Sequence, residues 1–181
     1  MQPCHRFILP LEKKTVAKSF RINEEALEQL HEEARSQAIS LNTLVNQLLI
    51  NYADFGRFMR RMQVKMLSQQ TLSELIEQLS EENVTKAGQN AGKTAPEALM
   101  TVTYGKITVG NVIQFIHHMS SYGNWFEYTE KNEGERVTIT LMHGMGRKWS
   151  LFIANYLSEA FAAAGCKAKY NVADRYVTFT I

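Results

Sequence analysis

Cysteine, proline and long apolar runs are all scarce in this chain of 181 residues. Its two cysteines, Cys4 and Cys166, lie far apart in the sequence and do not indicate a disulfide framework. No C-x-x-C or H-x-x-x-H spacing occurs, which argues against a structural zinc site. The longest apolar runs fall well short of the roughly 18 residues that cross a bilayer. We therefore expect no disulfide scaffold, no metal, no cofactor and no membrane span.

The charge is nearly balanced overall but unevenly distributed. The formal net charge is +2. Residues 1–66 carry ten Lys/Arg against seven Asp/Glu, residues 67–98 carry two against five, and residues 99–181 carry eight against six. A mild basic excess therefore lies at the N-terminal end. The first residues also lack the apolar stretch of a secretory signal, so a cytoplasmic location is expected.

The first 22 residues predict an arm followed by a short strand. Residues 1–14 contain two prolines and no periodicity, which is typical of a terminal arm. Val16, Phe20 and Ile22 then share one parity and predict a core-facing side. The other parity is small and polar apart from one arginine, and consists of Thr15, Ala17, Ser19 and Arg21.

Two capped amphipathic helices should follow the strand. Asn23 and Ser40 are good N-caps for them. The first apolar stripe consists of Leu27, Leu30, Ala34 and Ala38, and the second of Leu44, Val45, Leu48, Leu49 and Tyr52. One strand and two short helices cannot bury these stripes, and a lone strand has no ladder partner, so we expect a dimer.

This order of elements, with its S-L-N start to the second helix, resembles the ribbon-helix-helix DNA-binding family. The resemblance implies that two chains pair their strands and insert the ribbon into the major groove of double-stranded DNA. The positions that match its base-contacting residues are Ala17, Ser19 and Arg21. Ser40, Leu41 and Asn42 match the start of the second helix, whose N–H groups bind a phosphate.

Two other interpretations remain open for this module. One is an unrelated helical hairpin with a leading strand. The other is a ribbon-helix-helix dimer used only for assembly, which alanine at position 17 favours because it offers few base-reading groups.

Residues 53–66 are expected to extend the module, which we end at residue 66. The basic side chains Arg57, Arg60, Arg61 and Lys65 lie mainly on one side, where they either contact phosphates or form a solvated face. Residues 67–98 predict an acidic helical connector. Within it Ser80 caps a helix, and residues 92–98 form a break.

Residues 99–181 predict an α+β domain with helices on one face of an antiparallel sheet. The expected elements are a strand at 99–105, a helix through Val112 and Met119, a hairpin of 125–130 with 135–143, a helix from 146 that Gly165 stops, and a hairpin over 166–181. The whole layout resembles a group of archaeal proteins that join a ribbon-helix-helix module to an α/β domain. Segments 104–116, 123–130 and 139–157 carry that resemblance.

This half shows no catalytic triad and no paired acids at metal-ligand spacing, so we do not expect an enzyme. His143 stands before a glycine-rich turn, and with Arg147 or Lys148 it could hold an anion at a helix N-terminus. An ordinary strand-to-helix turn is the alternative. We therefore expect a homodimeric or tetrameric, nucleoid-associated transcriptional regulator whose C-terminal domain oligomerises or senses a small-molecule effector. The alternative is a non-sequence-specific chromatin-associated or antitoxin-like protein.

Overall fold

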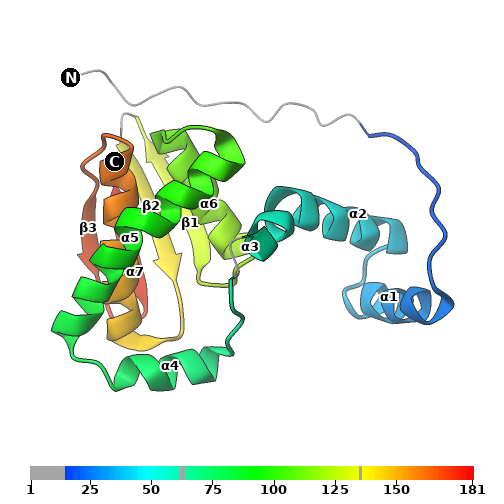
Figure 1. Ribbon diagram of the computed structural model, residues 1–181, viewed down its shortest axis with the longest axis horizontal. Coiled ribbons are helices and arrows are strands. Elements are labelled where there is room, and N and C mark those ends of the chain that lie inside the picture. Colours follow the sequence, from blue (N-terminus) through cyan, green and yellow to red (C-terminus); the bar gives the residue numbers. More distant parts are fainter. Residues whose placement is uncertain (1–14, 62–63, 135) are drawn as a thin grey trace. The chain divides into compact units, whose positions relative to one another are not determined.

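A computed structural model describes residues 15–61, 64–134 and 136–181 (Figure 1). The chain divides into two compact units, of which the first ends at Arg60 and the second begins at Arg61. The expected arm, residues 1–14, lies outside the described residues.

The first unit is a pair of capped helices with a helical extension. Its helices are α1 (Glu24–Ser36), α2 (Leu41–Asn51), the π-helical turn η1 (Tyr52–Gly56) and α3 (Arg57–Arg61). The predicted caps are confirmed, because Asn23 Oδ1 accepts from Ala26 N at 3.2 Å and Ser40 Oγ accepts from Thr43 N at 3.0 Å. The buried side chains of the unit are Ala34, Leu44, Phe55 and Phe58.

The strand predicted over residues 15–22 is absent from the single chain. These residues have no regular secondary structure, and Val16 and Phe20 are 81% and 69% exposed. A strand gains its hydrogen bonds from a neighbouring strand, and no described segment of this chain pairs with residues 15–22. The first apolar stripe is also shorter than predicted, since Ala38 lies beyond the end of α1 in the left-handed region at φ 53°.

The second unit combines four helices with one antiparallel sheet. Its elements are α4 (Gln69–Glu77), α5 (Glu81–Tyr104), α6 (Val109–Ser121), β1 (Glu127–Glu133), β2 (Arg136–Met142), α7 (Gly146–Ala163), β3 (Lys169–Val172) and β4 (Tyr176–Thr180). The α+β class, both hairpins, α6 and α7 are confirmed. Ser80 caps α5 as predicted, by accepting from Asn83 N at 3.2 Å.

Helix α5 corrects the predicted break at 92–98 and the predicted strand at 99–105. It runs unbroken through Pro96 and ends only at Gly105, which adopts φ 73°. Packing explains this result, because α5 lies directly against α7 (Figure 1). Position 92 requires glycine because α7 lies very close to it. An added Cβ would be 2.5 Å from Tyr156 O. Tertiary contact thus overrides the local signals of Gly92 and Pro96.

The sheet has the strand order β1-β2-β4-β3, with all pairs antiparallel. Alternate residues of its two central strands are fully or almost fully buried against the helices: Val137, Ile139, Leu141, Val177 and Phe179. Helices α6 and α7 cover this face, and α5 packs on α7 (Figure 1). The opposite face carries the other parity, including Thr138, Thr140 and Thr178, which are only half-buried.

Candidate nucleic-acid interface

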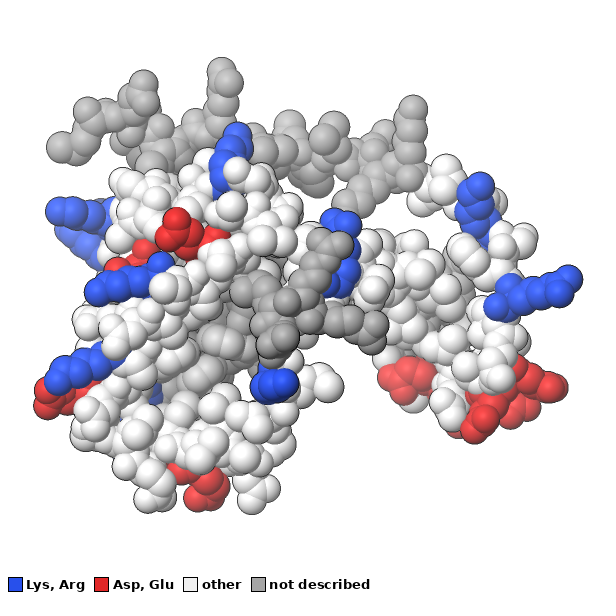
Figure 2. Space-filling model, in the orientation of Figure 1, with Lys and Arg blue, Asp and Glu red and all other residues white. Residues whose placement is uncertain are grey.

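The segment before α1 holds the three residues matched to base contacts. Ala17, Ser19 and Arg21 are all exposed, and Lys18 adds a second positive charge. Helix α1 itself is acidic in its first turn, with Glu24 and Glu25. Figure 2 shows acidic side chains gathered over α1, whereas basic side chains lie over the segment that precedes it. Within this unit the segment is therefore the more favourable surface for a polyanion.

The start of α2 offers a second contact for a phosphate. Ser40 caps the helix and its Oγ also lies 2.8 Å from Thr43 Oγ1. The first intrahelical backbone bond here is Leu44 N to Ser40 O, so helix geometry leaves the N–H groups of Leu41 and Asn42 without an intrahelical acceptor. Such free N–H groups at a helix N-terminus attract phosphate oxygens.

The structure places Arg21 and Ser40 at opposite ends of α1. Thirteen residues of α-helix rise about 20 Å. Backbone phosphates of one DNA strand repeat about every 3.4 Å along the axis. Within one chain Arg21 and the N-terminus of α2 are therefore too far apart along α1 to bind the same phosphate.

Arg57 is exposed, and its guanidinium lies 4.4 Å from the centroid of the Phe58 ring. The buried Phe58 therefore anchors the neighbouring cation at the surface. Arg60 and Arg61 belong to α3, but their side chains lie outside what the structure describes.

A single copy of the first unit leaves much apolar surface uncovered. The exposed side chains are Val16, Phe20 and Ile22 of the segment before α1 and Leu48, Leu49 and Tyr52 of α2 and η1. Burial of one such side chain stabilises a protein by ~1.5–3 kcal/mol. The surface is therefore of the kind that a second protein surface covers.

The residues of the second candidate site, at the N-terminus of α7, are engaged with other groups. Arg147 Nε lies 3.2 Å from Glu81 Oε1, and Lys148 Nζ lies 2.7 Å from Glu77 O and 3.0 Å from Glu77 Oε2. Both cations thus hold the α4–α5 region against α7. This geometry favours the ordinary strand-to-helix turn over an anion cradle.

His143 stabilises the same turn as a neutral imidazole. Its Nδ1 accepts from Met145 N at 3.3 Å, so Nε2 carries the proton and donates to Ser150 Oγ at 2.9 Å. Burial lowers the pKa of His143 to about 4. Ser150 is fully buried, so this serine–histidine pair is closed to a substrate.

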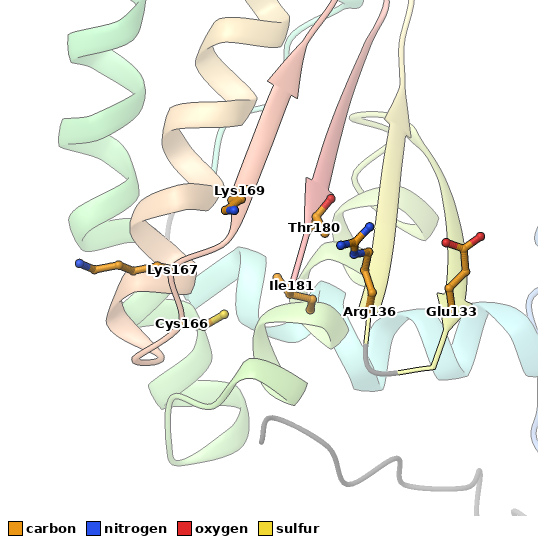
Figure 3. Close-up of a pocket in the computed structure, with 7 residues that line it drawn as sticks. All are labelled: Glu133, Arg136, Cys166, Lys167, Lys169, Thr180 and Ile181. Carbon is orange, nitrogen blue, oxygen red and sulfur yellow. The ribbon is translucent and has the colours of Figure 1, made fainter. Parts of the chain in front are cut away.

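A shallow cavity that the sequence did not indicate lies at one end of the sheet. Its volume is about 580 Å³, and Figure 3 shows its lining residues, Glu133, Arg136, Cys166, Lys167, Lys169, Thr180 and Ile181. They come from all four strands of the sheet, from the loop before β3 and from the residue after β4, so no local motif unites them. Strand parity could have placed Arg136, Lys169 and Thr180 on one face, but only once the strand order was known.

Metal ligands, membrane spans and known relatives were each sought. Within the described ranges, no three His, Cys, Asp or Glu side chains cluster in a way that could hold a metal ion. Among the same residues, no helix combines the length and apolarity of a membrane span. The chain matches no known protein family, no curated protein sequence and no solved structure.

Proposed function

We propose that this protein is a DNA-binding transcriptional regulator that acts as a homodimer or a pair of dimers. One observation carries the proposal. The exposed segment before α1 has apolar Val16, Phe20 and Ile22 on one parity, interrupted by Lys18, and it leads directly into two capped helices. Ser19 and Arg21 lie on the other parity. Such a segment suits pairing with its copy, with the apolar side inward and the arginine side on DNA.

The proposed contacts divide into two kinds. Arg21 reads base edges, because its guanidinium can bind guanine O6 and N7 with two parallel hydrogen bonds, a contact that contributes ~1–3 kcal/mol of discrimination. The N-terminus of α2 and the exposed Arg57 bind phosphates, which sets register and affinity but carries no sequence information. Arg21 is therefore the residue whose loss separates specific from non-specific binding.

The test is fluorescence-anisotropy binding to a genomic fragment library over a salt series, with the full chain. We expect one fragment to bind ~10³-fold or more tightly than bulk DNA. Arg21→Ala should remove that preference and leave the salt slope almost intact. Arg57→Ala should weaken all fragments alike and reduce the slope by about one.

Arg175→Ala is the matched control, because Arg175 is an exposed arginine of the second unit. It should bind DNA as the unaltered chain does. If every fragment binds alike and Arg21→Ala changes little, the segment does not read sequence. The protein would then be a chromatin-associated or purely assembling protein and not a regulator. If it binds no DNA even at low salt, both a regulatory and a chromatin-associated role are excluded.

In this proposal the second unit links two dimers or responds to an effector. A larger assembly would place two ribbons on adjacent half-sites, and any ligand that prefers one spacing of the dimers would alter DNA affinity. Analytical ultracentrifugation of the full chain distinguishes a dimer from a tetramer and decides between these assemblies.

A further inference from the structure

The helix-free face of the sheet is lined by hydroxyl and basic groups in register. One row across the four strands consists of Thr129, Thr140, Thr178 and Asn171. The next consists of Lys131, Thr138, Thr180 and Lys169. These two rows contain donors but little apolar surface, so this part of the face is suited to a polar ligand. The row on the other side of Thr140 and Thr178 pairs the exposed Met142 and Tyr176 and is more apolar.

The cavity of about 580 Å³ lies at the end of these rows (Figure 3). Lys169 of β3 pairs directly with Thr180 of β4, and Arg136 lies near the end of the neighbouring strand β2. Neighbouring strands are about 4.8 Å apart, so the two cations flank Thr180 from either side. In Figure 3 Arg136 extends toward Thr180, whereas Lys167 points away from it.

The local charge is positive. Arg136, Lys167 and Lys169 line the cavity, and within the described residues none of them forms an ion pair. The cavity's one acidic side chain, Glu133, is bound to Lys131 at 2.5 Å. Lys131 and, more weakly, Arg136 hold the pKa of Glu133 below its usual range, so it stays ionised.

We infer that this end of the sheet binds the phosphate or carboxylate group of a small molecule. Arg136 presents a planar fork that matches two oxygens of such a group, Lys169 supplies a point charge, and the Thr180 hydroxyl donates between them. The cavity is shallow, so it has room for the charged group while the rest of the molecule stays in solvent. A second copy of this face is disfavoured, because it would bring like charges together.

The site lies in the second unit, so its binding can be measured without DNA. Isothermal titration of the full chain would use pyrophosphate and citrate as probes at constant ionic strength. Arg136→Gln and Lys169→Gln should each raise the Kd of the better probe about tenfold or more. Lys93→Gln, an exposed lysine of α5 without an ion pair among the described residues, should leave it unchanged.

Glu133→Gln supplies a test of opposite sign. It removes a negative charge from the lining and frees Lys131, so it should tighten binding severalfold. Preference for pyrophosphate assigns the site to phosphates, and preference for citrate assigns it to carboxylates. The inference fails if neither probe binds at about 10 mM, or if Lys93→Gln weakens binding as much as Arg136→Gln. It also fails if Arg136→Gln and Lys169→Gln weaken the binding of duplex DNA and leave the binding of both probes unchanged. The face would then be a nucleic-acid surface.

Discussion

Substitution of Gly92 by alanine tests the close packing of α5 on α7, over which α5 continues as one unbroken helix. The new Cβ would lie 2.5 Å from Tyr156 O and 2.9 Å from Tyr156 Cα, closer than real Cβ contacts, and both atoms belong to the α7 backbone. Alanine gains up to about 1 kcal/mol of helix propensity over glycine. Overpacking of a core costs typically ~1–3 kcal/mol, or more where backbone cannot yield. Because the clash is with backbone, the upper end of this cost applies, and after the propensity gain is subtracted we expect Gly92→Ala to lower the free energy of unfolding by about 2 kcal/mol.

Gly110→Ala is the matched control for this prediction. Gly110 also lies in a helix, α6, but its added Cβ would meet only Thr108 Oγ1, at 3.9 Å. It should therefore gain stability, by up to about 1 kcal/mol. The two glycine-to-alanine changes thus have opposite expected signs.

Tryptophan fluorescence is the suitable assay, because both tryptophans, Trp125 and Trp149, lie in the second unit. For a unit of this size, 1 kcal/mol shifts the melting temperature by roughly 3–6 °C. Gly92→Ala should melt below the unaltered chain and Gly110→Ala at or above it. Equal or higher stability of Gly92→Ala would refute the close packing of α5 on α7.

Two further predictions concern single hydrogen-bonded groups. Since burial lowers the folded pKa of His143 to about 4 from 6.5, its contribution to stability is complete above pH 6.5 and is lost as pH falls toward 4. In His143→Gln the urea midpoint of unfolding should depend less on pH between 4 and 6.5. The same pH dependence as in the unaltered chain would contradict this prediction. Ser40→Ala removes the α2 cap and should cost ~1 kcal/mol in urea unfolding followed by circular dichroism, whereas exposed Ser121→Ala in the other unit should not affect the first unit.

The sequence predicted those elements whose signals are local. Helix α6 has an apolar stripe at helical spacing, and Val112, Phe115, Ile116 and Met119 are all buried in the structure. The N-caps Asn23, Ser40 and Ser80 marked helix starts through bonds that span only three residues. The strand predicted over residues 135–143 likewise agrees with β2, which spans Arg136–Met142.

The failures arise where distant residues decide the outcome. Gly92 and Pro96 predict a break when considered alone, but α7, about sixty residues later, supplies the surface on which α5 continues. At the second candidate site, Arg147 and Lys148 bind Glu81 and Glu77, which lie 66 and 71 residues away. The cavity at Arg136 depends on strand order, which no local pattern contains.

In the proposed dimer the segment before α1 is the extreme case, because its structure would depend on atoms of a second chain. Ordering the backbone of eight residues costs on the order of 8–16 kcal/mol. Burial of Val16, Phe20 and Ile22 returns at most about 9 kcal/mol, so these side chains alone cannot hold a strand. The exposed Leu48, Leu49 and Tyr52 and a hydrogen-bond ladder must contribute as well. In the proposed dimer all of these terms arise together, so ordering of Arg21 for DNA and association of two chains become one coupled step.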